Sequence, residues 1–486
     1  MGTIAKQSIT GTIVTYIGVA VGFFTTFFVL TRFLSATEIG LARVLIDAAT
    51  LFIGLAQLGT NSSIIRFFPY FKDGGRNHGF FFWTIIVPLI GFVLFTLVYW
   101  ACSRPLSAWF SENSPLFVDY YYFVLPLAFF MLYQSVFECS ANVLMHIVVP
   151  RAVREIGVRL GLLVTYLLYA FEVLSLNGFV IALCATYAAA SLINVCYLFS
   201  LGQISLKPDW PFLRENPQLV RRIGLYTGFL IVSALTSVLA PTISGFFITA
   251  KMGLDYTGIF AIATYIAVMV SIPYRSLVAI TQPELAQTIK DNDKPNTTRL
   301  LSQTSNNLLL VGGFIFLLIW INIDLIFALL PNGETYAVAK HTVLLLCIGQ
   351  WLVASFNIFN SALSYSRFYA LTLLNSCVLT VSALLLNNAL IPVWGMDGAA
   401  WATVLSDLAY YLLVVGIACF ALRLQPFNRR HILTVALVAV LFGLNYLLAD
   451  LHCLIRTVLL LGGGLALAWF MNLSPEINAL LRRIRI

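Results

Sequence analysis

The hydrophobic positions of this chain gather into long runs, and short charged stretches separate one run from the next. Runs of about 20 apolar residues are long enough to cross ~30 Å of hydrocarbon as an α-helix. None of the runs alternates between apolar and polar positions, as the strands of a membrane β-barrel would. The pattern therefore predicts an all-α polytopic membrane protein with about 14 transmembrane helices. Their positions are near 8–31, 39–60, 79–101, 120–147, 156–174, 177–200, 223–249, 256–280, 304–330, 340–365, 369–391, 398–422, 431–449 and 454–472.

The composition agrees with this class of protein. Apolar residues make up 60% of the 486 positions and charged residues only 10%, against about 25% charged in soluble domains. A soluble enzyme, a disordered tail and a disulfide scaffold are excluded on these numbers. The eight cysteines show no spacing typical of metal ligands, so neither a metal site nor a cofactor is expected.

The positive charges lie unevenly between the two sides of the membrane. Most of the 28 Lys and Arg residues fall in alternate loops, on the same side as both ends of the chain. Because cytoplasmic loops carry the excess of Lys and Arg, both termini are predicted to be cytoplasmic. This asymmetry accounts for the net charge of +8, and no basic patch interleaved with aromatic residues suggests nucleic acid as a partner.

A polar stretch divides the chain into two halves. We expect an N-terminal six-helix lobe at 1–201, a cytoplasmic linker at 202–222 and a C-terminal six-helix lobe at 223–422. Two extra transmembrane helices and an amphipathic tail beginning at Ser474 would fill 423–486. Similar residues recur at nearly constant offset: Gln134 and Gln350, Arg151 and Arg367, Pro69 and Pro283, and Gly40 and Gly258. These pairs favour a duplication, with parallel repeats related by an axis along the membrane normal.

The second segment carries a stripe of polar residues. Arg43, Asp47, Gln57 and Asn61 recur at helical spacing, so one helix face would present them all. A face of this kind cannot lie against lipid, and we expect it to face a water-filled substrate cavity. The alternative is that Arg43 and Asp47, one helical turn apart, only pair with each other.

The fourth segment repeats the pattern with Gln134, Glu138 and Asn142 at intervals of four. Within the membrane the Glu138 carboxylate must be protonated or paired. It therefore either binds a coupling cation or proton, as Asp47 also could, or joins two helices through a hydrogen bond.

Further polar positions lie in the second half and near the membrane surface. Gln350 and Asn357 share one face of the tenth segment, and Asp407 in the twelfth is expected to pair with another helix rather than to bind an ion. Arg66, Arg159 and Arg275 lie near the predicted cytoplasmic ends of their segments. Such arginines either snorkel to lipid headgroups or form a basic mouth that captures a phosphorylated substrate.

No motif for catalysis is found in the sequence. Walker A, GxSxG and HExxH patterns do not occur, so the protein is not expected to be an enzyme. Asp291-Asn292-Asp293 has the form of a glycosyltransferase DxD motif, but its short charged loop is typical of a solvated turn.

One element near the end of the second half is characteristic of a family. Ile391-Pro392-Val393-Trp394-Gly395-Met396-Asp397-Gly398-Ala399-Ala400-Trp401-Ala402-Thr403 resembles the IP-x-x-G-x-x-GAA-x-AT element of polysaccharide-biosynthesis flippases. These are the Wzx-type O-antigen branch of the multidrug/oligosaccharidyl-lipid/polysaccharide exporter superfamily. The stretches around Thr31-Arg32-Phe33-Leu34-Ser35 and Arg66-Phe67-Phe68-Pro69 also look like that family.

The resemblance implies a bacterial inner-membrane transporter that flips an undecaprenyl-pyrophosphate-linked oligosaccharide to the outer leaflet by alternating access. It also implies, as partners, membrane lipids and the polymerase and chain-length proteins of a lipopolysaccharide O-antigen or capsule pathway. Basic residues of a central cavity would hold the pyrophosphate; here these are Arg43, Arg66, Arg159 and Arg275, of which only Arg66 falls in a family motif.

Two alternatives remain open at this point. One is a multidrug or cation antiporter of the same superfamily, for which Asp47 and Glu138 are the available carboxylates of the first half. The other is a membrane polysaccharide polymerase or acyltransferase. That second alternative is disfavoured because the longest outer loops, 102–119 and 331–339, are too short to carry catalytic residues.

Overall fold

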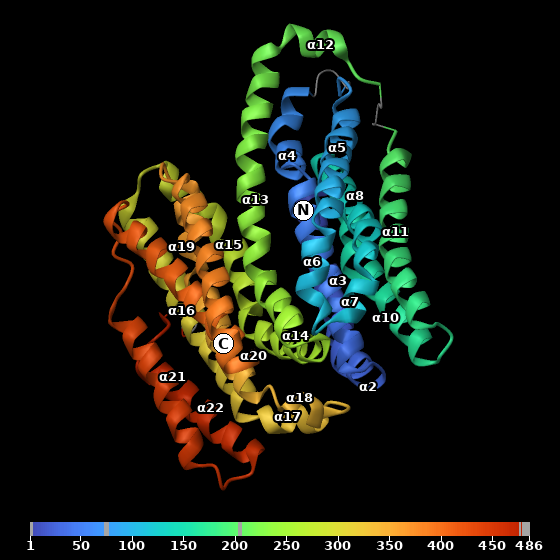
Figure 1. The fold of residues 1–486 in the computed structure, drawn as a ribbon. Coiled ribbons are helices and arrows are strands. Elements are labelled where there is room, and N and C mark those ends of the chain that lie inside the picture. Colours follow the sequence, from blue (N-terminus) through green and yellow to red (C-terminus); the bar gives the residue numbers. More distant parts are fainter. Residues whose placement is uncertain (1–2, 72–76, 203–206, 476–477, 479–486) are drawn as a thin grey trace. The chain divides into compact units, whose positions relative to one another are not determined.

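The computed structural model is helical throughout the part of the chain that it describes, residues 3–71, 77–202, 207–475 and 478 (Figure 1). Side chains are described within these ranges except at 3–9, 11–12, 229–238, 275–276 and 279–280. The chain forms two compact units, 1–258 and 259–486. The prediction of an all-α polytopic membrane protein is confirmed. The lobe boundaries at 201 and 223 stay a prediction.

The first unit is built around α3 and α8, which pack on each other and on α4, α5 and α11; α3 also packs on α13. Its helices are α1 (Thr3–Phe24), η1 (Thr25–Leu30), α2 (Thr31–Phe33), α3 (Ala36–Ala56), α4 (Thr60–Phe71), α5 (Phe80–Ala101), α6 (Ser103–Ser111), α7 (Pro115–Asp119), η2 (Tyr121–Phe123), α8 (Val124–Val143), α9 (Val148–Ala152), η3 (Val153–Gly157), α10 (Val158–Ala170), α11 (Leu176–Ser200), α12 (Trp210–Glu215), α13 (Pro217–Lys251) and the first residues of α14 (Leu254–Val268).

The second unit is organised around α16, which packs against α15, α19, α21 and α22. After the rest of α14, its helices are η4 (Met269–Ser271), α15 (Ile272–Lys290), α16 (Lys294–Ile321), α17 (Ile323–Leu329), α18 (Gly333–Ala337), α19 (Lys340–Tyr365), α20 (Leu371–Phe420), α21 (Arg429–Leu447) and α22 (Cys453–Phe470). Hydrogen bonds join both ends of α22 to α16. Asn322 Nδ2 donates to Thr457 Oγ1 at 2.8 Å, and Asn306 Nδ2 donates to the Leu473 carbonyl at 2.7 Å.

The membrane segments agree with the sequence pattern. Eleven helical stretches of the described chain are long and apolar enough to cross a bilayer. One of them is α20, where Gly395 has non-helical dihedral angles (φ 56°, ψ −131°) and separates two helices. Helix α13, and the helical run through α9, η3 and α10, cover the two remaining predicted segments.

The turn inside α20 lies between the predicted segments 369–391 and 398–422. A Cβ on Gly398 would lie 2.2 Å from the Leu390 carbonyl oxygen, whereas residues eight apart in a straight helix are separated by about 12 Å. The chain therefore folds back tightly around Gly395. The Asp397 carboxylate in this turn accepts a hydrogen bond from Thr342 Oγ1 at 2.6 Å, which fixes the turn to the start of α19.

Two glycines that the repeat analysis paired lie against each other. A Cβ on Gly40 would lie 2.0 Å from the Leu254 carbonyl oxygen, and one on Gly258 would lie 2.0 Å from the Ala36 carbonyl oxygen. Each carbonyl belongs to the residue four positions before the opposite glycine, so the contact is the same in both directions. Beside it, Thr37 Oγ1 donates to the Asp255 carboxylate, and these two residues are 218 positions apart, as the glycines are. This local two-fold contact between α3 and α14 favours a duplicated chain with parallel repeats.

The structure changes the predicted end of the second segment, and it does not test the predicted tail helix. The second segment does not end near residue 60, because after a break at Leu58 and Gly59 the chain continues as α4 through Pro69 to Phe71. The tail helix predicted from Ser474 falls largely on residues 476–477 and 479–486, which lie outside the described part.

The contact between Gly40 and Gly258 generates the first prediction. Gly40→Ala places a methyl group where α3 and α14 touch, and overpacking of this kind costs about 1–3 kcal/mol. We expect a lower midpoint in thermal unfolding of the purified protein. Gly416→Ala, in α20, is the matched control, because a Cβ there meets nothing within 4 Å. If Gly40→Ala and Gly416→Ala have the same midpoint of thermal unfolding, the contact between α3 and α14 does not require a glycine at position 40.

Candidate functional site

The charged residues of α3 form an ion pair within the helix. Arg43 Nε donates to Asp47 Oδ2 at 2.8 Å, and the two side chains are 25% and 12% exposed. Helix α13 passes beside the pair, since a Cβ on Gly245 would lie 3.5 Å from Asp47 Oδ2. The alternative in which Arg43 and Asp47 pair with each other is therefore observed. This pairing does not decide whether Arg43 also contacts a substrate.

The polar stripe of the second segment does not lie on one helix. Gln57 ends α3, and Asn61 belongs to α4, because Leu58 and Gly59 adopt positive φ angles of 47° and 65°. The expectation of a single helix face from Arg43 to Asn61 is therefore wrong. The break turns Asn61 towards α8, where its Nδ2 donates to Ser135 Oγ at 2.7 Å.

Helix α8 holds its polar residues inside the first unit. Gln134 and Glu138 are buried, and Asn142 is half-buried. Arg154 Nη1 donates to Glu138 Oε1 at 2.7 Å, so the carboxylate is paired across two helical elements, α8 and η3. Of the two alternatives for Glu138, the hydrogen bond between helices is observed, with Arg154 as its partner, and the binding of a coupling cation or proton stays a prediction.

The ion pair of Glu138 belongs to a larger charged network. Arg154 also contacts Glu155 Oε1 at 2.9 Å, and Arg159 Nη2 lies 3.3 Å from Glu155 Oε2. Two carboxylates and two guanidinium groups thus alternate from α8 through η3 to the start of α10, with formal charges that cancel. Helix α1 covers this network, since a Cβ on Gly22 would lie 2.8 Å from Arg159 Nη1.

Arg66 is held in a different way. It is exposed on α4, and its guanidinium carbon lies 4.2 Å from the centre of the Tyr226 ring on α13. Stacking on an aromatic face orients a guanidinium and leaves its N–H groups available to an anion. Within the described part of the chain, no carboxylate oxygen lies within 4.0 Å of its nitrogens.

The candidate residues of the second half lie in the second unit. Gln350 and Asn357 are half-buried on α19, where Ser361 of the same helix accepts a hydrogen bond from Gln282 Nε2 at 3.2 Å. Asp407 on α20 is close to α19, since its Oδ2 would lie 4.0 Å from a Cβ on Gly349. The side chain of Arg275 lies outside the described part.

The loop containing the DxD-like sequence is a helix cap. Asp293 accepts hydrogen bonds from Asn296 Nδ2 at 2.6 Å and from the Asn296 backbone N–H at 3.1 Å, at the start of α16. These bonds hold the pKa of the Asp293 carboxyl below its usual value. The expectation of a solvated turn is consistent with this geometry. Among the described residues, no group of three or more His, Cys, Asp or Glu could hold a metal ion.

The structure thus brings the candidate residues of the first half together in one unit and adds partners that the sequence did not reveal. Arg154 and Tyr226 are the main additions. Glu138 and Arg154 are separated by 16 positions and by an intervening turn, so no helical spacing signals their contact. Tyr226 lies 160 positions from Arg66, beyond the reach of any local pattern.

The fold is that of known membrane transporters. The solved structure of the lipid II flippase MurJ, in an inward closed conformation, matches with a TM-score of 0.65 over 95% of this chain and 99% of the flippase, at 12% identity. An inward-facing multidrug resistance MATE family transporter matches with a TM-score of 0.60 over 84% and 94%, at 14% identity. The Vibrio cholerae MATE transporter VcmN gives a TM-score of 0.57 over 86% and 98%, at 12% identity.

These likenesses define the class: a multi-pass membrane protein with the fold of the flippases and transporters of the multidrug/oligosaccharidyl-lipid/polysaccharide superfamily. The sequence model of the polysaccharide biosynthesis protein family matches residues 4–289. The chain belongs to that family, as the element at Ile391–Thr403 suggested. A search among curated proteins finds no match.

The contact between Glu138 and Arg154 generates the second prediction. Glu138→Gln and Arg154→Gln should each destabilise the protein, and the double variant should lose less than the sum. For side chains in contact, the interaction energy is about 0.5–3 kcal/mol. Because Arg154 is 49% exposed, we expect the lower part of that range. Thermal unfolding of the four proteins measures it.

A more exposed ion pair provides the control for this cycle. Lys340 Nζ lies 2.5 Å from Asp324 Oδ1, with side chains 43% and 76% exposed. Surface pairs of this kind contribute about 0–1 kcal/mol. If the two cycles give the same interaction energy, the contact between Glu138 and Arg154 has no special role in holding α8 to η3.

Proposed function

We propose that the protein carries a polyprenyl-pyrophosphate-linked oligosaccharide from the cytoplasmic to the outer leaflet of a bacterial inner membrane by alternating access. The observation that carries this proposal is membership of the polysaccharide biosynthesis family in a chain with the fold of a lipid flippase. Both termini would then lie in the cytoplasm, as the distribution of Lys and Arg predicts. O-antigen and capsule repeat units are the substrates to test first.

The side chains of the first unit support this function. A pyrophosphate needs cationic donors, and Arg66 offers an exposed guanidinium that Tyr226 orients. Arg43 adds a second cation on α3, and Asn61 of α4 and Ser135 of α8 are polar positions that can exchange hydrogen bonds with sugar hydroxyls. A substrate with a charged linkage and an uncharged, polar glycan matches this distribution.

The second candidate is a cation or drug antiporter, the activity named for the MATE neighbours. It requires carboxylates that a cation can reach. Asp47 and Glu138 are available, but each is engaged by an arginine, Arg43 and Arg154 respectively. Binding a cation at either carboxylate would require its guanidinium partner to move away, so the geometry favours the first proposal.

A leaflet assay separates the two functions. In a deletion strain, complete lipid-linked repeat units should accumulate and remain shielded from an impermeant lectin applied to spheroplasts. Units that reach the outer face but stay unpolymerised would point instead to an enzyme acting after translocation. Absence of any accumulated lipid, together with sensitivity to dyes, would favour the antiporter.

The third prediction concerns Arg43. Arg43→Ala should lower the lectin-accessible fraction by about tenfold, as expected for loss of one charge-assisted contact to phosphate or sugar. It also leaves Asp47 without its ion-pair partner. Arg43→Lys keeps the charge and should retain part of the activity. Restoration of surface polysaccharide to wild-type levels by Arg43→Ala, at equal expression, would remove Arg43 from the substrate path.

A further inference from the structure

The first unit contains a cavity of about 210 Å³ between α4, α5, α12 and α13. Its walls are mostly hydrocarbon, including Ile64, Phe80 and Ile223. Three of the four hydroxyl groups on the lining have partners: Thr84 Oγ1 donates to the Phe81 carbonyl at 2.9 Å, and Ser63 and Thr227 share a hydrogen bond. Thr60 Oγ1 and Trp83 Nε1 are buried without a partner among the described residues. Apart from these two groups the lining is almost entirely hydrocarbon, and apolar cavities of this kind bind apolar molecules.

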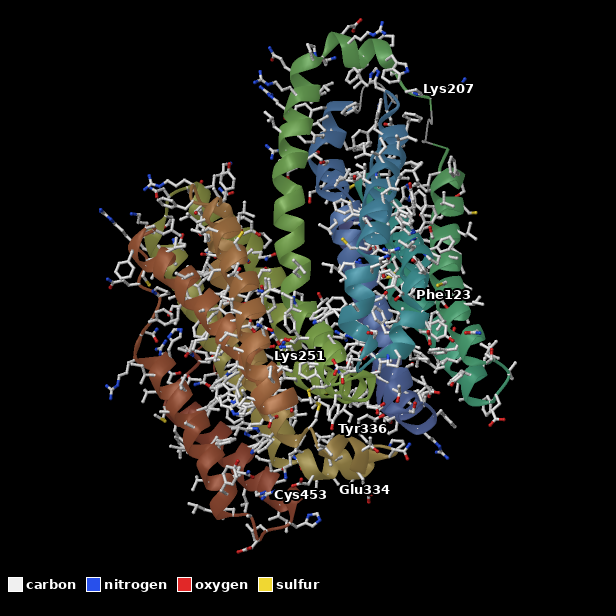
Figure 2. All side chains as sticks on the ribbon, in the orientation of Figure 1. Phe123, Lys207, Lys251, Glu334, Tyr336 and Cys453 are labelled. Atoms are coloured by element: carbon white, nitrogen blue, oxygen red, sulfur yellow. The ribbon has the colours of Figure 1, made fainter. Side chains whose placement is uncertain are left out.

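Helix α12 lies across the ends of α4 and α5 and closes one end of the cavity, to which it contributes Leu213 (Figure 1). Lys207, labelled in Figure 2, lies on the segment that precedes α12. Aromatic rings hold α12 in place. Trp210 meets Trp83 edge-on with ring centres 5.4 Å apart, and Phe212 lies 5.2 Å from Phe71. Because several contacts fix α12, the cavity is formed before any ligand arrives.

A second interaction holds α12 to the loop between α4 and α5. His78 stacks on Phe212 with ring centres 4.2 Å apart, and its Nδ1 lies 2.8 Å from Asp209 Oδ2. Val220 on α13 is 45% exposed, more than the other lining residues, and we therefore take its position as the mouth of the cavity. A hydrocarbon chain can therefore enter along α13 without displacing α12.

Positive charge lies beside this apolar space. The stacked pair of Arg66 and Tyr226 lies on the same two helices that line it: Arg66 is two positions after the lining residue Ile64, and Tyr226 directly precedes the lining residue Thr227. Arg222, exposed on α13, adjoins the lining residue Ile223. An apolar cavity flanked by arginines is complementary to a hydrocarbon chain that ends in a phosphate.

We infer that this cavity binds the phosphate-proximal segment of the isoprenoid chain of a polyprenyl phosphate lipid, with the phosphate against Arg66. The inference rests on the proposed function, because the lipid carrier of the proposed substrate has a single isoprenoid chain. A cavity of about 150 Å³ holds a benzene molecule. The 210 Å³ here therefore accepts a short methyl-branched segment and leaves the rest of the chain in the bilayer.

The fourth prediction tests this binding site directly. The probe is a polyprenyl phosphate with a diazirine on its hydrocarbon chain close to the phosphate, photolysed with the purified full-length protein in lipid nanodiscs. Mass spectrometry should find the label on peptides from α4, α5 or α13 that line the cavity. Ile223→Trp fills the cavity and should reduce labelling there by about tenfold.

Leu225→Trp is the matched control, because it adds the same side chain two positions away on α13, at a residue that is 68% exposed and does not line the cavity. The Leu225→Trp variant should be labelled by the probe to the same extent as the wild type. Val220→Trp, at the mouth, is a second blocking variant in case Ile223→Trp does not fold. Arg66→Ala should weaken labelling by about tenfold while keeping it on the same peptides.

Competition separates the sources of the hydrocarbon chain. Unlabelled polyprenyl phosphate should abolish labelling, and an equal amount of phosphatidylglycerol should not. Equal competition by phosphatidylglycerol would overturn the inference in favour of a general lipid site, and so would labelling that Ile223→Trp leaves unchanged. Cavity labelling in a protein that moves no lipid-linked oligosaccharide would contradict the proposed function alone, whereas transport without cavity labelling would contradict this inference alone.

Discussion

A charged side chain in hydrocarbon costs about 2.5–3.5 kcal/mol at the centre of a helix unless another group compensates it. This cost explains where the charges of the first unit lie. Asp47 and Glu138 are each paired with an arginine, Arg43 and Arg154, at 2.8 and 2.7 Å. Arg66, which has no carboxylate partner among the described residues, is exposed in the middle of α4. The two carboxylates Asp47 and Glu138 therefore have partners, and the unneutralised Arg66 is exposed where it can meet a headgroup or a phosphate.

The two-fold contact of Gly40 with Gly258 brings together helices that are far apart in sequence. Because each glycine packs on the carbonyl of the residue four before the other, any larger side chain at either position would separate α3 from α14. The same helix α3 carries Arg43 and Asp47, and Ser35 and Glu38 form a capping box at its start. The glycine contact with α14 and the ion pair of Arg43 with Asp47 therefore both depend on the placement of one helix.

Hydrophobic periodicity was sufficient to predict the transmembrane helices, because a bilayer imposes a minimum length and leaves no unpaired backbone polar group. The turn at Gly395 falls between two predicted segments, whereas the repeat offset marked Gly40 and Gly258 as equivalent positions without predicting that they touch. The break between Gln57 and Asn61 could not be predicted from the sequence, because Leu58 adopts a positive φ, which is uncommon for leucine. The partners of Glu138 and Arg66 were inaccessible for a different reason: they come from other helices, and only packing brings them together.

The ion pairs also constrain how transport could be driven. A cation at Asp47 or Glu138 competes with the guanidinium that already binds the carboxylate. An anionic substrate would instead compete with the carboxylate for the guanidinium. Phosphate binding to Arg43 would release Asp47 to a cation or proton, whereas loss of the phosphate would restore the ion pair. Under the proposed function, a coupling ion and a pyrophosphate would thus favour each other's binding, because each separates the same pair of side chains.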